Sequence, residues 1–288
     1  MLFRKCRARA GRFQGERDLA TFKHVFRKAS EAPDLPSPWE SPQWVSHLDR
    51  YADKLNHATV ADRVRELARI ARYGNGLPRT MSPLKALLRR NGSAPILDVG
   101  GGFGDNFIVL RKHLGETPYT IVDGAESCRV GRRVLGDRVR FQTDLPTDGH
   151  YGLSILIGTL QYILDSKSFI SALSRLSGDT IFVSRSPLRK AGDDFYSIQD
   201  ITPEQGASSA GECIVRIRNV ENVADDFAQA GFELVESKEV MSYKEQMSSL
   251  PEEYRDCSYF NMTFRKLGLT LLCLTVIGQR YTAELAMV

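Results

Sequence analysis

The sequence predicts an α/β fold in which a mainly parallel sheet follows a helical region. From residue 95 onward, short apolar runs typical of buried strands alternate with amphipathic stretches typical of helices. The run Ile96–Val99 leads into a glycine-rich turn and then a helical pattern, which is the order found at the ligand-binding corner of a doubly wound sheet. We therefore divide the chain into a basic arm with a helical cap over residues 1–81 and an α/β domain over 82–288.

Composition indicates an ordinary globular protein. Hydrophobic residues make up 42% and charged residues 26% of the 288 residues. The five cysteines are scattered without a C-x-x-C pair, which favours reduced thiols over a disulfide framework and predicts no metal site. The basic N-terminus is not followed by an apolar signal segment, and the most apolar run, 267–278, is shorter than the roughly 20 residues that span a bilayer. We expect a cytoplasmic protein.

Charge is distributed unevenly along the chain. Residues 1–90 contain 19 lysines and arginines against 9 acidic residues, a net charge of +10, and the remainder has a net charge of −6. A basic region joined to an acidic domain suggests an anionic partner such as a membrane surface, a phosphorylated substrate or nucleic acid. Solvated helix faces would give the same pattern.

The N-terminal region is predicted to be mostly helical. Residues 1–15 show no periodicity and are expected to form an arm, and Asp18–Lys28 has the pattern of a short helix. A proline-rich linker carries Trp39 and Trp44, which either line a substrate mouth or attach the linker to the body of the protein. Further amphipathic patterns predict helices over 43–56, 58–73 and 82–90.

The α/β region yields seven predicted strands and four helices between them. The strands are expected at 96–99, 119–122, 139–142, 153–157, 180–184, 232–236 and 269–277. The helices are expected at 105–114, 125–135, 166–176 and 220–230. No clear helix separates the last two strands, so we expect a final antiparallel hairpin to close the sheet.

Acidic residues follow the first three predicted strands. Asp98 ends the first strand, Asp123 ends the second, and Asp144 follows the third. Asp123 comes 19 residues after Gly104, close to the offset of about 20 at which a carboxylate meets a ribose. Asp144 is expected to accept a hydrogen bond from an adenine amine, with Phe141 or Leu145 packing on the base.

The glycine turn has the spacing Asp98-x-Gly100-x-Gly102-x-Gly104, with Gly101 as a fourth glycine. Glycines permit positive φ and allow a ligand to approach the main chain closely. A carboxylate at the strand end would repel a pyrophosphate, so the turn favours a cationic or neutral nucleoside over a dinucleotide.

On these residues, the stretch 95–188 resembles the class I S-adenosylmethionine-dependent methyltransferases. The resemblance implies a Rossmann-like sheet of seven strands, mainly parallel with an antiparallel last strand. It implies that S-adenosylmethionine is the cofactor and that its sulfonium cation suits the acidic strand ends. The implied cofactor-binding residues are Asp98, Gly100, Gly101, Gly102, Gly104, Asp123, Gly124, Asp144, Leu145, Gly158 and Gln161.

A narrower resemblance involves segments later in the chain. The segments 158–163, 184–188, 198–203 and 227–235 are similar to a family of methyltransferases found with bacterial surface-polysaccharide biosynthesis. Tyr162 stands where many small-molecule methyltransferases have a histidine, and Gln199-Asp200 stands where this family has a Gln-His pair. The resemblance implies O-methylation of a small-molecule or glycan acceptor, with anionic and lipid-linked acceptors included.

Transfer of a methyl group to a hydroxyl requires a base as well as positioning. Asp200 is the first candidate for this base, with Tyr162, Glu204 and His150 as alternatives. Arg185 and Arg189 are candidates for a bidentate clamp on a phosphate or carboxylate of the acceptor, and Gln161 and Tyr162 are candidates for hydrogen bonds to the cofactor carboxylate or the acceptor.

Three other functions compete with this interpretation. A nicotinamide dehydrogenase would need G-x-G-x-x-G, but Asp105 stands at the last position. A nucleic-acid methyltransferase would suit the basic N-terminal region, but the Asn/Asp-Pro-Pro-Tyr and Pro-Cys motifs are absent after the fourth strand, so nucleic acid is not the expected partner. A non-catalytic binding protein would not require the intact glycine turn together with Asp123.

Overall fold

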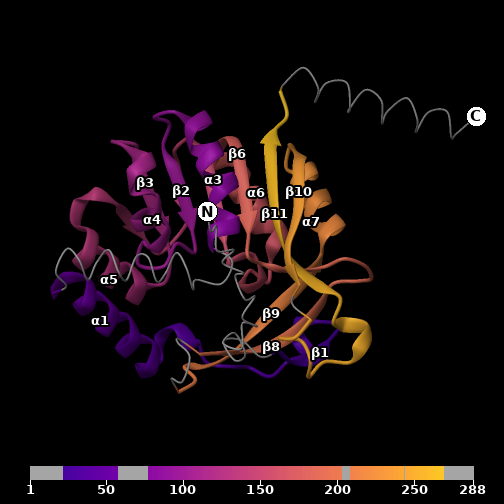
Figure 1. Ribbon diagram of the computed structural model, residues 1–288. Coiled ribbons are helices and arrows are strands. Elements are labelled where there is room, and N and C mark those ends of the chain that lie inside the picture. Colours follow the sequence, from indigo (N-terminus) through magenta and orange to yellow (C-terminus); the bar gives the residue numbers. More distant parts are fainter. Residues whose placement is uncertain (1–21, 58–76, 203–207, 243, 269–288) are drawn as a thin grey trace, which may run out of the picture.

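The computed structural model describes residues 22–57, 77–202, 208–242 and 244–268. Within these ranges it contains six α-helices and an eleven-stranded mixed sheet (Figure 1). The predicted α/β class is confirmed, but the sheet has more strands than the seven that the resemblance implied.

Five parallel strands carry the candidate site, in the order β4-β3-β2-β5-β6. Their bounds are Ile96–Val99 for β2, Tyr119–Val122 for β3, Arg140–Gln142 for β4, Tyr151–Ile157 for β5 and Ser177–Ser184 for β6. Because β2 pairs with β3 on one side and β5 on the other, the strand order reverses at β2. Ligands of open α/β sheets bind outside the carboxyl ends of the strands at such a point.

Helices cover both faces of these strands, which explains why β2, β3 and β5 are apolar almost throughout. One face packs against α3 (Leu77–Asn91), α4 (Asp105–Leu114) and α5 (Ala125–Leu135). The other face packs against α6 (Ser166–Leu176) and α7 (Val220–Gln229). Side chains of Asp165 and Asn219 cap the last two helices by accepting from the backbone N–H groups of Ser168 and Glu221.

The C-terminal part of the described chain forms an antiparallel hairpin. Strand β11 (Cys257–Lys266) runs antiparallel to β6, and β10 (Phe232–Ser242) pairs with β11. The expected hairpin is present, but its second strand lies at 257–266, in a stretch that the sequence does not identify as a strand. Strand β11 contains buried polar residues, so its sequence lacks a continuous apolar pattern. One of them is Asn261, whose Oδ1 accepts from Ser184 Oγ at 2.5 Å. The strand predicted at 269–277 lies outside the described residues.

Four further strands extend the sheet beyond β11. They are β7 (Pro187–Arg189), β9 (Gly211–Asn219), β8 (Phe195–Ile201) and β1 (Phe22–Phe26), in that spatial order. The helix predicted over 18–28 is wrong in its described part, because residues 22–26 form β1, an edge strand antiparallel to β8. The apolar residues Phe22, Val25 and Phe26 have helical spacing, but five residues are too few to distinguish a helix from a strand by periodicity.

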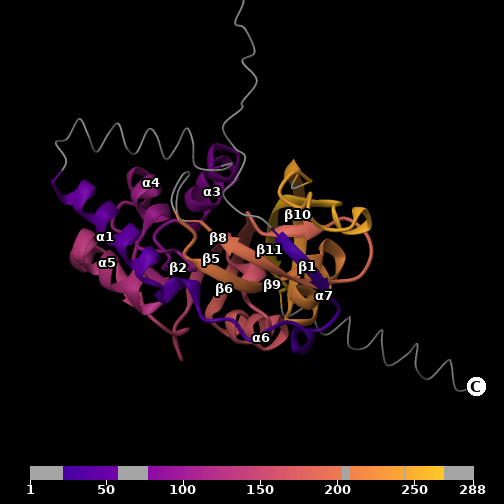
Figure 2. The same cartoon turned by 90° about the horizontal axis from the view of Figure 1, so that it is seen from below.

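The strands β8 and β9 pass across the carboxyl ends of the parallel strands. In Figure 1 they lie below the main sheet, and β11 has its arrowhead at the top, so the antiparallel β6 has its carboxyl end at the bottom. Seen from below, β8 and β9 lie over β5 and β6 (Figure 2). These two strands therefore form a layer facing the edge where ligands of such sheets bind.

The described N-terminal elements lie at the same edge. Two short 3-10 helices, η1 (Ala29–Glu31) and η2 (Pro38–Glu40), lead into α1 (Pro42–His57), which confirms the helix predicted over 43–56. In α1, Asp49 pairs with Arg129 and Arg133 of α5, each at 3.0 Å. The predicted arm and the helix over 58–73 lie outside the described residues. None of the described helices has the length and apolar character needed to cross a bilayer.

Candidate active site

The glycine turn between β2 and α4 has the conformation that its sequence requires. Gly100, Gly102 and Gly104 have φ values of +71°, +60° and +109°. The N–H of Gly100 donates to Val122 O of β3 at 2.7 Å, and the N–H of Gly104 donates to Gly101 O at 3.1 Å. A Cβ on Gly102 would meet no atom closer than 3.9 Å, so the main chain there is open to an approaching group.

Asp98 lies beneath this turn and has no exposed surface. Its carboxylate accepts hydrogen bonds from Tyr119 Oη at 2.7 Å and from Asn106 Nδ2 at 3.1 and 3.3 Å. A Cβ on Gly101 would come within 2.7 Å of Asp98 Oδ2, which shows how closely the turn covers the carboxylate. The structure therefore places Asp98 under the glycine turn, where it supports the loop from inside.

Burial raises the pKa of Asp98 to about 6, against hydrogen bonds from Tyr119 and Asn106. Since the folded protein then binds this proton more tightly than the unfolded chain, stability falls as pH rises from about 4 to about 6. We expect this group to remove on the order of 2–3 kcal/mol across that window. The Asp98→Asn variant should lose this part of the pH dependence in urea denaturation curves. The exposed Asp144→Asn variant should keep it, and parallel wild-type and Asp98→Asn curves would contradict the assignment.

Asp123 joins the second strand to the glycine turn. Its Oδ2 accepts from the N–H of Gly102 and its Oδ1 from the N–H of Gly124, each at 2.8 Å. Burial raises the pKa of Asp123, against hydrogen bonds from Gly102, Ser127 and Gly124. The side chain keeps partial exposure, and a Cβ on Gly124 would meet nothing within 4 Å. The carboxylate thus lies at an open position between two backbone amides.

Asp144 and Leu145 follow β4 at the same edge of the sheet. Asp144 is exposed, and its Oδ2 accepts from Thr143 Oγ1 at 3.0 Å. Leu145 is half-buried against the apolar cluster on the α6–α7 face. These positions follow from the parallel pairing of β3 and β4, which brings the ends of both strands together. Their contact with a base stays a prediction.

The segment after β5 forms the opposite wall. Gly158 has a φ of +70°, and residues 160–162 form the 3-10 helix η4 (Leu160–Tyr162). Gln161 is only 5% exposed and donates its Nε2–H to Gly158 O at 3.0 Å. The ring of Tyr162 lies 5.2 Å from that of Trp39 in an edge-to-face arrangement. The predicted residues Gly158, Gln161 and Tyr162 therefore come together with the linker that holds the tryptophans.

Two charged residues, Asp105 and Arg185, interact electrostatically at this edge, and only Arg185 is among the site residues that the sequence predicts. Asp105 begins α4 directly after the turn, and burial raises its pKa to about 7, against the attraction of Arg185. Arg185 has a φ of +55°, a left-handed conformation rare outside glycine. Acidic residues are common in the first turn of a helix, and Asp105 has this position in α4. The sequence therefore does not indicate its interaction with Arg185.

The structure does not form the expected clamp of two arginines. Arg189 is 9% exposed, and its guanidinium donates to Asp193 O and Glu253 O, both at 2.7 Å. It also lies over the rings of Phe195 and Tyr254, at 5.5 and 5.0 Å from their centroids. These contacts hold Arg189 inside the protein, because β7 carries it away from the turn that contains Arg185.

The structure also separates Asp200 from the residues that face the sheet edge. Its carboxylate accepts from Ser209 Oγ at 2.5 Å and pairs with Lys23 at 3.5 Å. Tyr162 packs against an apolar cluster that includes Phe195 and Val215. Successive residues of a strand point to opposite faces, so Asp200 lies on the other face of β8 from Phe195. Ser209 and Lys23 thus engage the carboxylate of Asp200 on that face.

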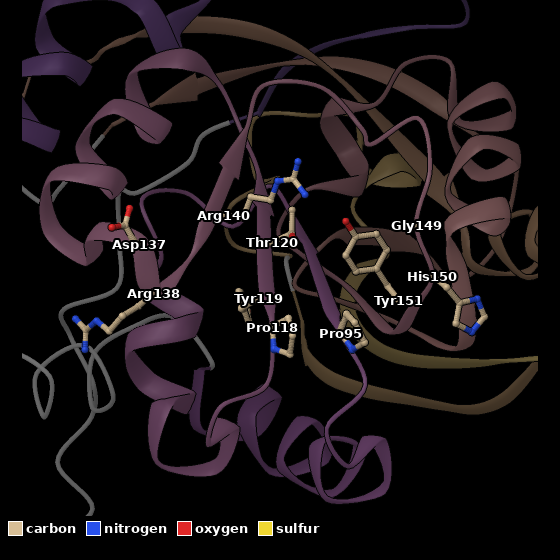
Figure 3. Close-up of a pocket in the computed structure, with 10 residues that line it drawn as sticks. All are labelled: Pro95, Pro118, Tyr119, Thr120, Asp137, Arg138, Arg140, Gly149, His150 and Tyr151. Carbon is tan, nitrogen blue, oxygen red and sulfur yellow. The ribbon is translucent and has the colours of Figure 1, made fainter.

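A further candidate base, His150, is also not brought to this edge. His150 precedes β5 and lines a pocket at the opposite, amino end of the strands, together with Pro95, Pro118 and Tyr151 (Figure 3). A residue before a parallel strand cannot reach the carboxyl edge, which corrects its assignment to the substrate mouth. Glu204 lies outside the described residues. Among the candidates that the structure describes, Tyr162 is the one at the site.

Comparison with known proteins places this fold beside solved methyltransferases. Similar structures include the 1,6-didemethyltoxoflavin-N1-methyltransferase from Burkholderia thailandensis, with 18% identity, 82% of this chain and 93% of that chain covered, and a TM-score of 0.45. An S-adenosylmethionine-dependent methyltransferase from Mesorhizobium loti has 16% identity, 64% and 96% coverage and a TM-score of 0.45. One from Clostridium acetobutylicum has 11% identity, 73% and 100% coverage and a TM-score of 0.46.

No family model and no curated protein matches the chain. At the identities and TM-scores of the solved structures, similarity carries no inference about the ligand or reaction of this chain. Any inference about function therefore depends on the residues of the site.

Proposed function

We propose that the protein is an S-adenosylmethionine-dependent methyltransferase. The observation that carries this proposal is the contact between Asp123 and the glycine turn, in which one carboxylate meets the N–H groups of Gly102 and Gly124 at 2.8 Å. A carboxylate at the end of the second strand, beside an open glycine turn, suits ribose hydroxyls and repels pyrophosphate. The acidic surroundings of Asp98, Asp105 and Asp123 suit a cationic ligand.

The residues present fit this cofactor. The open main chain at Gly102 supports a position there for the ribose and methionine portion, and Asp123 is proposed to accept from the ribose hydroxyls. Asp144 and Leu145 are proposed to meet the adenine, and Gly158 and Gln161 the methionine end. The bound cofactor supplies a methyl group on a sulfonium, and this methyl group leaves with the formation of a neutral thioether.

The protein must position the acceptor and allow the acceptor hydroxyl to lose its proton. Attack requires a lone pair about 3–3.5 Å from the methyl carbon and in line with the bond that breaks. A hydroxyl acceptor loses its proton as the new bond forms, and we propose that this proton passes to solvent water. Tyr162, on the wall formed by η4, is the residue that we propose to orient this hydroxyl, and Arg185 is proposed to meet the acceptor at the end of β6.

We further propose a small-molecule or glycan acceptor and O-methylation, which the narrower sequence resemblance supports. The described cysteines, Cys128, Cys213 and Cys257, are free thiols, which supports a reducing compartment such as the cytoplasm. Contact of the basic N-terminal region with an anionic surface remains a proposal, because much of that region lies outside the described residues.

A ligand panel in a thermal unfolding assay tests the cofactor. We expect S-adenosylhomocysteine at about 100 times its dissociation constant to raise the melting temperature by about 5 °C. NAD⁺ should give no shift at the same concentration, because its pyrophosphate would face the acidic turn. A shift with NAD⁺ and none with S-adenosylhomocysteine would replace this proposal with a dehydrogenase.

A further inference from the structure

The amino ends of the parallel strands hold a cavity that the proposed reaction does not involve. Its volume is about 360 Å³, and residues at the starts of β2, β3, β4 and β5 line it (Figure 3). Because these strands are parallel, the cavity lies at the opposite edge of the sheet from the glycine turn. A cavity of this size can hold a small organic molecule.

Two hydroxyl groups of nearly buried side chains reach this cavity without a protein partner. Thr120 of β3 is 6% exposed and Tyr151 of β5 is 7% exposed, and both line the cavity. Within the ranges that the structure describes, neither side chain makes a hydrogen bond. Figure 3 shows the Tyr151 hydroxyl turned toward the space over Thr120. Polar groups of buried side chains usually have a partner, and a ligand with acceptor atoms would provide one for both hydroxyls.

The strand register places a guanidinium group beside these hydroxyls. Arg140 is paired with Thr120 in the β3–β4 ladder, so their side chains leave the same face of the sheet. Val122 lies two residues after Thr120 and belongs to one apolar cluster with Tyr151, so Tyr151 lies on that face too. Figure 3 shows the Arg140 guanidinium near the Tyr151 hydroxyl. One cation and two hydroxyl donors thus come together from three strands.

The charges around the cavity favour an anion. Arg140 forms no ion pair with any residue that the structure describes. Arg138 and Asp137 also line the cavity, and in Figure 3 both lie away from the two hydroxyls. The ring of His150 packs against Gly178, where a Cβ would lie 2.3 Å from its Nε2. The guanidinium of Arg140 is therefore the charge that accompanies the two hydroxyls.

We infer that this cavity binds a small organic phosphate, whose phosphate group is held by Arg140, Thr120 and Tyr151. A phosphate monoester has three terminal oxygens, one for each of these donors, and guanidinium groups bind phosphate through charge-assisted hydrogen bonds. A carboxylate has only two oxygens. The cavity is larger than a phosphate group, so the organic part of the ligand would lie beside the rings of Pro95 and Pro118. This site is separate from the proposed methyl-transfer site and does not depend on it.

Calorimetric titration of the full chain with ribose 5-phosphate tests this inference. The wild type should bind this probe with a dissociation constant below about 1 mM, and ribose without the phosphate should give no binding heat. Arg140→Met should weaken binding at least about tenfold, because it removes a charged donor. Thr120→Val and Tyr151→Phe each remove one hydroxyl and keep the shape of the side chain, so each should weaken binding about fivefold.

The matched control is Arg111→Met, which removes the same charge from an exposed position of α4 outside the cavity and should bind as the wild type does. Saturating S-adenosylhomocysteine should leave the affinity for ribose 5-phosphate unchanged, because the two sites lie at opposite edges of the sheet. A wild type that binds ribose 5-phosphate but not S-adenosylhomocysteine would support this inference and remove the proposed function.

Four results would overturn the inference. The first is no binding of ribose 5-phosphate to the folded wild type at about 10 mM, and the second is equal binding by Arg140→Met and Arg111→Met. The third is full binding by both Thr120→Val and Tyr151→Phe, which would reduce the site to a surface contact with one arginine. The fourth is competition with S-adenosylhomocysteine, which would place the phosphate at the other edge.

Discussion

Replacement of Asp123 by alanine is expected to abolish the stabilisation of the protein by S-adenosylhomocysteine. The wild-type carboxylate accepts from Gly102 and Gly124 at 2.8 Å and lies at an open position beside the glycine turn. A charged group that binds two ribose hydroxyls contributes at least about 3 kcal/mol, so its loss should raise the dissociation constant by about two orders of magnitude. The measurement is the melting temperature with and without ligand.

The matched control for this prediction is Asp137→Ala. Asp137 is an exposed acid that lines the pocket at the amino end of the strands, so its removal changes the net charge equally but not the candidate site. This variant should keep the full ligand shift. Equal shifts for Asp123→Ala and the wild type would show that the ribose is held elsewhere, and equal losses in both variants would indicate a general effect of charge.

Replacement of Gly100 by alanine is expected to disrupt the turn itself. Gly100 has a φ of +71°, and a Cβ there would lie 2.1 Å from Thr159 Oγ1 and 2.9 Å from Thr159 Cβ. Rotation of the threonine cannot relieve a contact with its own Cβ, and Thr159 Oγ1 also donates to Val99 O at 3.0 Å. Backbone strain and overpacking together should cost about 4 kcal/mol of the free energy of unfolding. Ligand stabilisation should be lost as well.

Gly136→Ala separates these two causes. Gly136 has a φ of +58°, but a Cβ there would meet nothing within 4 Å, so only backbone strain of about 1–2 kcal/mol is expected. Urea denaturation of both variants measures the difference. If Gly100→Ala were no less stable than Gly136→Ala, then Thr159 would not be packed against the turn as described, and the turn would have another conformation.

The parallel half of the sheet could be predicted from the sequence because local and tertiary signals agree there. Strands buried on both faces appear as continuous apolar runs, as in β2 and β3, and helices with one apolar face follow them in order. The glycine turn was identified for a similar reason, since positive φ at Gly100, Gly102 and Gly104 restricts the residue type. Asp123 could be predicted as a site residue because it lies 19 residues after Gly104.

The antiparallel layer could not be predicted in the same way. β8 and β9 contain buried polar residues, such as Ser197 in β8 and Arg218 in β9, so their apolar alternation is incomplete. The direction of a side chain depends on strand register, which the sequence does not contain. For that reason the sequence predicts Asp200 as a base, although its carboxylate contacts Ser209 and Lys23. It also predicts Arg189 as a ligand clamp, although backbone carbonyls hold its guanidinium inside the protein. The burial of Asp98 likewise depends on Tyr119 and Asn106, which only the fold brings to it.

Isothermal titration calorimetry of the wild-type chain with S-adenosylhomocysteine tests the central claim most directly. If the glycine turn and Asp123 form a nucleoside site, the titration should show one binding site per chain with a dissociation constant in the micromolar range. The Asp137→Ala control should give the same curve. A folded wild-type chain that gives no binding heat, even at ligand concentrations of about 1 mM and at two temperatures, would contradict the claim.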